Sequence, residues 1–274
     1  MNKWFCGTSL ILAAALPGFA QAPAISQGGV VNGASFSLDQ PDKRVAPGSL
    51  ISIFGTNLAA SPALADSIPI STALGDVQSV TFNGIAAPIL SASAGQINVQ
   101  LPWDEIAPSG GTTDIPVVVT RKSTGASAPI QTPIGQYSPG IFTAPAGAGH
   151  ALALIFPDNA IAAPVGSIPG RLTRPAKPGD ILEIYATGLG PVTGTPKDGG
   201  EPSGTSTTTL KPVVTIGDIN ASVQFSGLAP GFVGLYQVNI EVPQHAPVGD
   251  AVPLQIEIGG ITSTKQATIA VAAP

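Results

Sequence analysis

The chain has 274 residues, of which 43% are hydrophobic and only 10% are charged, and its formal net charge is −5 at pH 7. Its 11 Lys and Arg residues form no basic run, which argues against nucleic acid as a partner because that binding depends on cationic contacts to phosphate. The 33 Gly and 28 Pro residues punctuate short runs of Val, Ile and Leu. This pattern, without a segment of convincing helical periodicity after the N-terminal region, predicts an all-β protein.

The N-terminal segment, residues 1–22, is predicted to be a cleaved signal peptide. Met1-Asn2-Lys3 is positively charged, residues 10–16 form an uncharged apolar run, and Ala20-Gln21-Ala22 has the small-x-small pattern of a cleavage site. The apolar run is well short of the roughly 20 residues that a spanning helix needs. We therefore expect a secreted protein, periplasmic or extracellular, with no transmembrane span after cleavage. Cys6, the only cysteine, leaves with this segment, so the mature chain has no disulfide and no thiolate metal ligand.

The first predicted domain covers residues 25–142. A Pro-Gly turn at residues 47–48 precedes a strand that ends at Thr56-Asn57-Leu58, where Asn accepts a positive φ. A second strand leads into Asn83-Gly84, a strong signal for a two-residue hairpin. Further strands are predicted over residues 96–101 and 115–120.

The second predicted domain covers residues 143–274 and repeats this order. It opens with a strand over residues 151–156, and a Pro-Gly turn at residues 178–179 then precedes the strand that ends at Thr187-Gly188-Leu189. A weaker hairpin signal lies at Gly217-Asp218. Strands are predicted over residues 237–242, 254–258 and 267–271. Because the junction near Phe142 is short and partly apolar, we expect the two domains to pack against each other.

One strand occurs in both halves, as Gln96-Ile97-Asn98-Val99-Gln100-Leu101-Pro102 and as Gln237-Val238-Asn239-Ile240-Glu241-Val242-Pro243. Apolar and polar residues alternate in each copy, so the apolar residues are predicted to face a core and the polar residues the opposite side. The closing proline removes a ladder donor and ends the strand. The repeat predicts two tandem immunoglobulin-like β-sandwich domains and indicates no chemical activity.

Two loops are candidates for an interaction surface, residues 59–75 and residues 193–209. The second contains Asp198-Gly199-Gly200-Glu201 and a Ser/Thr-rich stretch, which is typical of a long mobile loop. Its carboxylates, or Asp218 with Asn220, could supply oxygen ligands to calcium, although neither set matches a defined calcium loop. We expect no cofactor.

Several motifs together resemble the Solibacter-type C-terminal domain family: Val31-Asn32-Gly33-Ala34-Ser35-Phe36, Ala46-Pro47-Gly48-Ser49, Gln96-Ile97-Asn98-Val99, Ser138-Pro139-Gly140-Ile141-Phe142, the stretch Ile184-Tyr185-Ala186-Thr187-Gly188-Leu189-Gly190-Pro191-Val192, and residues 228–243. The resemblance covers the chain from about Val30 onward. That family is abundant in secreted proteins of Acidobacteria, usually appended to other extracellular modules. Each half also resembles immunoglobulin-like domains of the IPT/TIG type. The resemblance implies no catalytic residue.

The residues themselves offer little for catalysis. The only histidines are His150 and His245, no Gly-x-Ser-x-Gly motif occurs, and two distant histidines without cysteine make a poor zinc site. Asp104 and Glu105 are adjacent, so on a strand they would point to opposite faces rather than face each other as a glycosidase pair does. We therefore do not expect an enzyme, and a glycoside-active enzyme is the minor alternative.

Two binding roles remain. The first is a protein-interaction, adhesion or structural module of the cell envelope or exterior, acting through strand edges or the two loops. The second is a carbohydrate-binding module that stacks sugars on exposed aromatic rings, with Trp103, Phe232 and Tyr236 as candidates. For these three rings, packing within or between the domains is the other interpretation.

Overall fold

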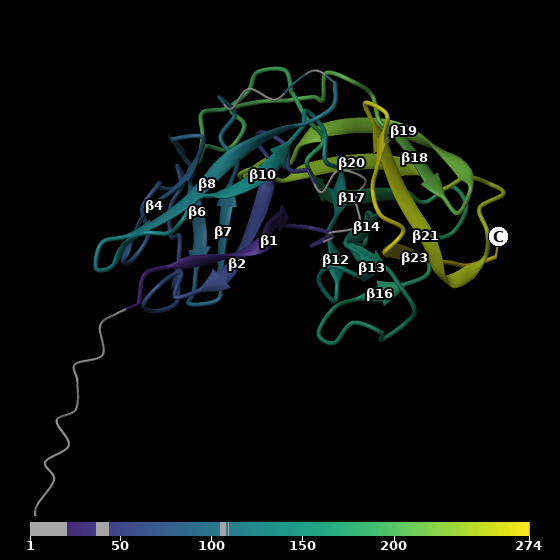
Figure 1. Ribbon diagram of the computed structural model, residues 1–274. Coiled ribbons are helices and arrows are strands. Elements are labelled where there is room, and N and C mark those ends of the chain that lie inside the picture. The colour runs from purple at the N-terminus through teal and green to yellow at the C-terminus, as the bar shows by residue number, and fades with distance from the viewer. Residues whose placement is uncertain (1–20, 37–43, 105–107, 109, 274) are drawn as a thin grey trace, which may run out of the picture.

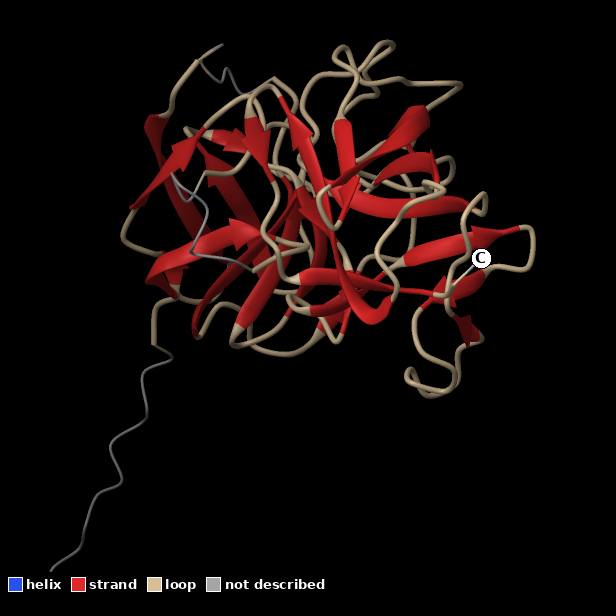
Figure 2. Cartoon of the chain, turned by 90° about the vertical axis from the view of Figure 1, so that its right-hand side faces the viewer, coloured by secondary structure: helices blue, strands red, loops and turns tan. Residues whose placement is uncertain are grey.

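The structure is a computed structural model that describes residues 21–36, 44–104, 108 and 110–273 (Figure 1). Residues 1–20 of the predicted signal peptide and Glu105 lie outside the described residues. Strands and loops make up all of the described chain, with no helix in it, as Figure 2 shows. The all-β prediction is therefore confirmed. It follows that no apolar helix long enough to cross a membrane occurs in the described ranges.

Two sheets form the first unit, which we define as residues 24–134. The first sheet is antiparallel throughout and has the order β1 (Ala24–Asn32), β2 (Leu50–Thr56), β7 (Gln96–Gln100), β6 (Ile89–Ala92), β3 (Ala63–Leu64). The second sheet has the order β10 (Ile130–Ile134), β8 (Thr113–Arg121), β4 (Val77–Phe82), β5 (Ile85–Ala86), and β9 (Gly125–Ala126) also pairs with β8.

The two sheets of the first unit share one core, because alternate residues of each point toward the other. The fully buried side chains come from both: Ile51, Ile53, Ile97 and Val99 from the first, and Val80, Phe82, Val117 and Val119 from the second. The inward direction predicted for Ile97, Val99 and Leu101 is confirmed. The Asn83-Gly84 hairpin is also confirmed. It joins β4 to β5, and both central residues have the positive φ (49° and 86°) that this tight turn requires.

The second unit, residues 137–271, is built on one continuous hydrogen-bonded path of strands. Its order is β12 (Thr143–Ala144), β13 (Gly149–Ala151), β23 (Ala267–Val271), β21 (Gly249–Ile258), β18 (Val213–Ile216), β19 (Ile219–Leu228), β20 (Tyr236–Glu241), β17 (Ile181–Thr187), β14 (Ala153–Phe156), β15 (Ala160–Ala162), β16 (Thr173–Arg174). β11 (Gly140–Ile141) pairs with β17, and β22 (Ile261–Thr262) pairs with β21. A bridge between Ala176 and Val271 links the end of this path back to β23, so the path folds back on itself around a core.

The core of the second unit begins at Tyr137 and ends at Val271. The predicted inward residues Val238, Ile240 and Val242 are all fully buried in it, which confirms the alternation in the second copy of the repeated strand. The strand predicted over residues 151–156 is divided by Leu152 into β13 and β14, which lie in different parts of the path.

Buried hydrogen bonds join the two units. Asn32 Nδ2 donates to the Ser138 carbonyl (2.7 Å), and Ser138 Oγ donates to the Arg44 carbonyl (2.7 Å). The Leu50 N–H of β2 donates to Thr187 Oγ1 at the end of β17 (2.8 Å). Asn32, Ser138 and Thr187 are buried, and buried polar groups keep their partners because water cannot replace them. These bonds set the position of one unit against the other.

The loop 193–209 lies across the junction and does not extend freely into solvent. Its Gly199 N–H donates to Gln100 Oε1 (2.7 Å), and the Gly199 carbonyl accepts from the Ile70 N–H (2.8 Å). Asp198 Oδ1 accepts from the Trp103 N–H (2.7 Å). The two candidate interaction loops, residues 59–75 and 193–209, therefore meet. Gln100, predicted to face away from the core with the other polar residues of its strand, does so, but it is buried against this loop.

Candidate functional site

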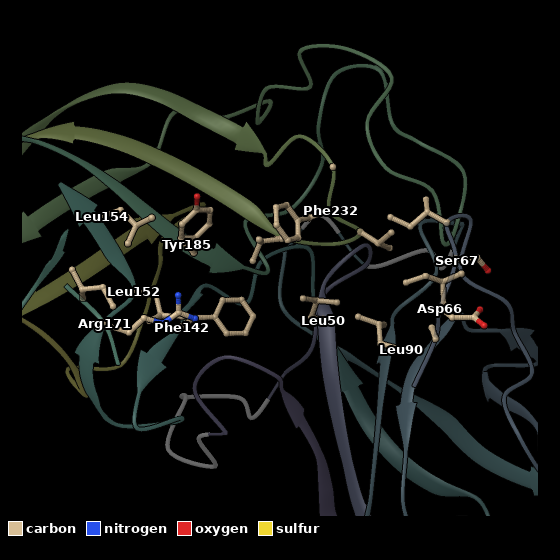
Figure 3. Close-up of a pocket in the computed structure, with 17 residues that line it drawn as sticks. Leu50, Asp66, Ser67, Leu90, Phe142, Leu152, Leu154, Arg171, Tyr185 and Phe232 are labelled. Carbon is tan, nitrogen blue, oxygen red and sulfur yellow. The ribbon is translucent and has the colours of Figure 1, made fainter. Parts of the chain in front are cut away.

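A cleft of about 1060 Å³ lies between the two units (Figure 3). The first unit contributes Leu50, Leu90, and residues 65–68 and 70 of the first loop. The second unit contributes Leu154 of β14, Tyr185 of β17, Ile161 of β15 and the turn that follows β19, together with loop residues. Its full set is Phe142, Leu152, Leu154, Ile161, Arg171, Tyr185, Gly231, Phe232, Val233 and Leu235. Most of these side chains are aliphatic or aromatic, so the cleft is an apolar hollow at the junction.

The outward faces of core strands form the walls of the cleft. In β17, Tyr185 lies between the buried residues Ile184 and Ala186, so its ring points away from the core and into the cleft. Leu154 has the same place in β14, and Leu50 the same place in β2. The outward face of a half-buried strand is usually polar. Large apolar side chains gathered on such a face indicate a surface that takes a partner.

The wall of the second unit is fixed by a ring of three backbone hydrogen bonds. The Phe142 N–H donates to the Tyr185 carbonyl (3.0 Å), the Tyr185 N–H to the Leu152 carbonyl (3.0 Å), and the Leu152 N–H to the Phe142 carbonyl (2.7 Å). The side chains of these residues therefore stand on backbone that is already paired. A ligand would find this wall preformed, which reduces the entropy lost on binding.

Phe232 is the most exposed ring of the cleft, at 54%. It lies in a turn between β19 and β20 that two glycines of positive φ permit, Gly231 (79°) and Gly234 (66°). The turn closes with hydrogen bonds from the Phe232 N–H to the Ala229 carbonyl (3.3 Å) and from the Ala229 N–H to the Leu235 carbonyl (2.9 Å). The ring is thus presented to solvent by a closed turn.

One buried hydroxyl connects the two walls. Thr187 Oγ1 accepts from the Leu50 N–H of the first wall (2.8 Å) and donates to the Gly234 carbonyl in the Phe232 turn (3.0 Å). Gly234 itself passes close to the first unit, because a Cβ at this position would lie 3.0 Å from the Gly48 carbonyl oxygen. Thr187 therefore sets the spacing between Leu50 and the turn that carries Phe232.

Few polar groups line the cleft. Asp66 and Arg171 are exposed and lie on opposite walls, as Figure 3 shows. Burial raises the pKa of the Tyr185 phenol, and the nearby Glu183 carboxylate raises it further. The Tyr185 hydroxyl is therefore a neutral hydrogen-bonding group at physiological pH.

The three aromatic residues predicted as ligand contacts do not converge. Phe232 alone lines the cleft. Tyr236 is fully buried, its hydroxyl donates to the Gly190 carbonyl, and burial raises its pKa. Trp103 is half-buried, packs against the core of the second unit, and lies so close to Gly48 that an added Cβ would overlap its ring. In this structure Tyr236 and Trp103 are packing residues of the second unit and the junction.

No family model matches the chain, and the search of curated proteins found no match. Among solved structures, the mixed-linkage glucan utilization locus protein SGBP-B of Bacteroides ovatus matches with a TM-score of 0.35 and 12% identity, over 86% of this chain and 46% of that one. The surface glycan-binding protein PbSGBP-B of Prevotella bryantii matches with a TM-score of 0.28 and 13% identity, over 91% of this chain and 41% of that one. The chain thus spans less than half the length of both. Likenesses at this level assign neither a family nor a function.

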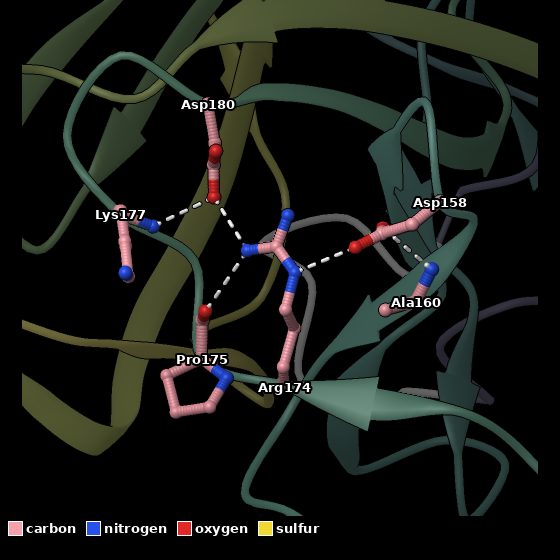
Figure 4. A network of polar contacts seen from close by, with 6 residues as sticks. All are labelled: Asp158, Ala160, Arg174, Pro175, Lys177 and Asp180. Carbon is pink, nitrogen blue, oxygen red and sulfur yellow. Dashed lines mark hydrogen bonds and ion pairs between the residues drawn. The ribbon is translucent and has the colours of Figure 1, made fainter.

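Two carboxylates converge elsewhere in the second unit, on the guanidinium of Arg174 (Figure 4). Arg174 Nε donates to Asp158 Oδ2 (2.8 Å) and Arg174 Nη1 to Asp180 Oδ2 (2.7 Å). Asp158 also accepts a hydrogen bond from the Ala160 N–H (3.1 Å), and Asp180 accepts one from the Lys177 N–H (2.9 Å). The Arg174 hydrogen bond lowers the pKa of Asp158. A glycosidase acid needs a raised pKa, so this network is suited to holding β16 and its flanking turns together rather than to catalysis.

The remaining titratable residues form no compact set. Across the described ranges, no group of three or more His, Cys, Asp and Glu side chains is placed to hold a metal ion. His150 lies on β13, whereas His245 lies in the turn after β20. Burial raises the pKa of Asp198, and the nearby Asp104 carboxylate raises it further. The hydrogen bond from the Trp103 N–H lowers this pKa, but by less than burial raises it. Asp198 is engaged in the junction, where it holds Trp103.

Most residues of the cleft are not predicted from the sequence. One signal was present, since residues 151–156 read Ala-Leu-Ala-Leu-Ile-Phe without alternation. A strand that is apolar on both faces is covered on both faces, by a second layer or by a partner. The other contributors, Leu50, Leu90 and Phe142, are single apolar residues that only the packing of the two units brings together.

Proposed function

We propose that this protein is a secreted, non-catalytic binding module that holds an apolar segment of a protein partner in the cleft between its two units. The observation that carries the proposal is the cleft itself. Its volume of about 1060 Å³ is just above the range of about 300–1,000 Å³ that is usual for ligand pockets. Leu50 and the wall of the second unit stand on paired backbone, and Thr187 fixes the spacing between Leu50 and the Phe232 turn, so this part of the cleft needs little ordering on binding.

The chemistry of the lining favours a protein partner. The side chains of Leu50, Leu90, Leu152 and Leu154 offer methyl groups and no hydrogen bonds, which suits leucine-, valine- or phenylalanine-like side chains of a partner. A ring such as Phe232, exposed on a rigid turn, is the kind of residue that acts as an interface anchor.

A neutral polysaccharide is the second candidate for the same cleft. Phe232 offers a flat exposed face for stacking, and the Tyr185 hydroxyl can bind a sugar hydroxyl. The aliphatic walls favour it less, because a sugar needs more hydrogen-bonding groups than Asp66, Ser67 and Arg171 supply.

Secretion and family membership belong to the same proposal. The signal-like pattern of residues 1–22 supports export. The repeated Gln-x-Asn strands, β7 and β20, lie beside the corresponding strands β2 and β17, which supports two related immunoglobulin-like domains of the Solibacter type.

The test is a screen of residues 23–274 against a random peptide phage library and, in parallel, a glycan array. We expect enrichment of peptides with two or more large apolar residues, and an affinity about tenfold or more lower in Phe232→Ala, because an exposed aromatic anchor contributes at least this much. Phe156→Ala is the matched control, since Phe156 is 60% exposed but does not line the cleft. Equal losses in both variants, or no enrichment, would contradict the proposal. Glycan binding lost only in Phe232→Ala would select the polysaccharide instead.

A further inference from the structure

A second hollow, of about 560 Å³, lies on the outer face of the first sheet. Its polar part is formed by Gln96 and Asn98 of β7, Ser91 of β6 and Ser93, which follows β6. Residues 62–64, which include edge strand β3, form an apolar wall. We call it the amide groove. Gln96 and Asn98 belong to the strand that is repeated in the sequence, and the cleft does not use them.

A closed network of hydrogen bonds orients the side chains on the floor of the amide groove. Asn98 Oδ1 accepts from Ser52 Oγ (2.8 Å) and from Gln96 Nε2 (2.9 Å). Asn98 Nδ2 donates to Ser91 Oγ (2.9 Å), and Gln96 Nε2 also donates to Ser52 Oγ (3.3 Å). Ser52 is buried beneath them. The two amides are therefore held in one orientation.

The network leaves specific hydrogen-bonding capacity facing the groove. An amide oxygen accepts two hydrogen bonds and an amide nitrogen donates two. Asn98 Oδ1 already accepts two hydrogen bonds. One N–H of Asn98 Nδ2 and the oxygen Gln96 Oε1 have no hydrogen-bond partner in the described chain. The Ser91 hydroxyl accepts from Asn98 and keeps its own hydrogen to donate. The floor thus presents an acceptor beside two donors, in fixed positions and without a charge.

We propose that the amide groove is a binding subsite for a neutral saccharide. Neighbouring hydroxyls of a pyranose ring each donate and accept, so they match an acceptor beside two donors. The C–H face of the ring would lie against Leu64, which is 77% exposed on the apolar wall. No charged side chain lines the groove, which favours a neutral sugar over a uronic acid or a phosphate.

The second copy of the strand provides an internal control. Gln237 Nε2 donates to Asn239 Oδ1 at 2.9 Å, the same bond at the same distance as between Gln96 and Asn98. Gln237 and Asn239 do not line the amide groove. A variant at Gln237 therefore makes the same chemical change on a strand of the same kind and leaves the proposed subsite intact.

The amide groove and the cleft are adjacent along the chain, because Leu64 and Ser91 of the groove directly precede or follow Ala65 and Leu90 of the cleft. The saccharide proposal does not depend on the function proposed for the cleft. Variants at Gln96 or Ser91 change no cleft residue, so each proposal can fail separately.

The experiment is a titration of ¹⁵N-labelled residues 23–274 with cellohexaose, mannohexaose, xylohexaose, laminarihexaose and chitohexaose, followed by the side-chain amide resonances of Gln96 and Asn98. We expect at least one oligosaccharide to shift both resonances, with a Kd on the order of 1 mM for a subsite of so few contacts. Gln96→Ala should weaken this binding about tenfold, since it removes an acceptor and frees the Asn98 amide. Ser91→Ala should weaken it similarly, and Gln237→Ala should leave it unchanged.

Gln96→Glu, which keeps the size but replaces both N–H donors with an anionic oxygen, is the second variant if Gln96→Ala fails to fold. It should weaken the binding similarly, because Asn98 Oδ1 and Ser52 Oγ lose the donor that orients them. Three results would each overturn the proposal. The first is that none of the five oligosaccharides, at about 10 mM, shifts the two amide resonances. The second is that Gln237→Ala weakens binding as much as Gln96→Ala does. The third is that only Phe232→Ala abolishes binding, which would place the saccharide in the cleft.

Discussion

Thr187→Val removes one hydroxyl from the junction between the units and changes the volume of the side chain little. The hydroxyl holds the Leu50 N–H (2.8 Å) and the Gly234 carbonyl (3.0 Å), and Thr187 is fully buried. Each buried polar group left without its partner costs about 1–3 kcal/mol, so the variant should lose about 2–6 kcal/mol of unfolding free energy. No cavity contributes to this loss, because valine fills the same space.

Thr187→Ser is the matched control. Serine keeps the hydroxyl and loses only a buried methyl group, so it should cost about 1 kcal/mol. The order of stability expected from the structure is therefore parent, then serine, then valine. The affinity for a cleft ligand should follow the same order, since Thr187 fixes Leu50 relative to the Phe232 turn.

Urea denaturation of residues 23–274 measures this order. Trp103 is the only tryptophan in that range and packs at the junction, so its fluorescence reports the separation of the units. Far-UV circular dichroism is recorded together with it, because two units need not unfold in one step. A valine variant within about 0.5 kcal/mol of the parent, or a serine variant as unstable as valine, would refute the reasoning.

Two further predictions concern the same junction. Gly48→Ala should destabilise the protein by about 1–3 kcal/mol or more and change the fluorescence emission of Trp103. Gly48 has a φ of 73°, and an added Cβ would overlap the Trp103 ring. An unchanged melting temperature would contradict this prediction. Asp198→Asn keeps the oxygen that accepts from the Trp103 N–H. Burial raises the folded pKa of Asp198, so its contribution to stability is present at low pH and is lost as the pH rises through that pKa. The Asn variant should therefore melt higher than the parent at about pH 7 but not at about pH 3, below the usual carboxyl pKa; the same rise at both values would count against the assignment.

Local sequence patterns predict the strands of this protein well. Period-two alternation identifies the inward residues of β7 and β20, and Asn83-Gly84 identifies a hairpin, because each signal depends on neighbours in the chain. The Gly217-Asp218 hairpin between β18 and β19 is also present. The division at residue 142 stays a prediction; Tyr137 and Ile141 pack into the second core.

The junction and the cleft could not be predicted in the same way, because they depend on which outward faces meet. Gln100 follows the polar pattern of its strand, yet the backbone of Gly199 covers it. A Gly-rich loop reads as mobile in sequence, and only the structure shows that its backbone groups find partners in the first unit. Of the three aromatic candidates, Tyr236 and Trp103 are packing residues, since large rings contribute buried area wherever neighbours allow it.

The hydrogen bonds between the two units, made by Asn32, Ser138 and Thr187, also bear on how the gene of such a protein can recombine. Each unit carries buried polar groups whose partners belong to the other, so either half alone would expose an incomplete surface to water. Recombination that moved a single half into another gene would separate these groups from their partners. The pair of units, rather than a single unit, is therefore the smallest piece that can move between proteins with these buried hydrogen bonds intact.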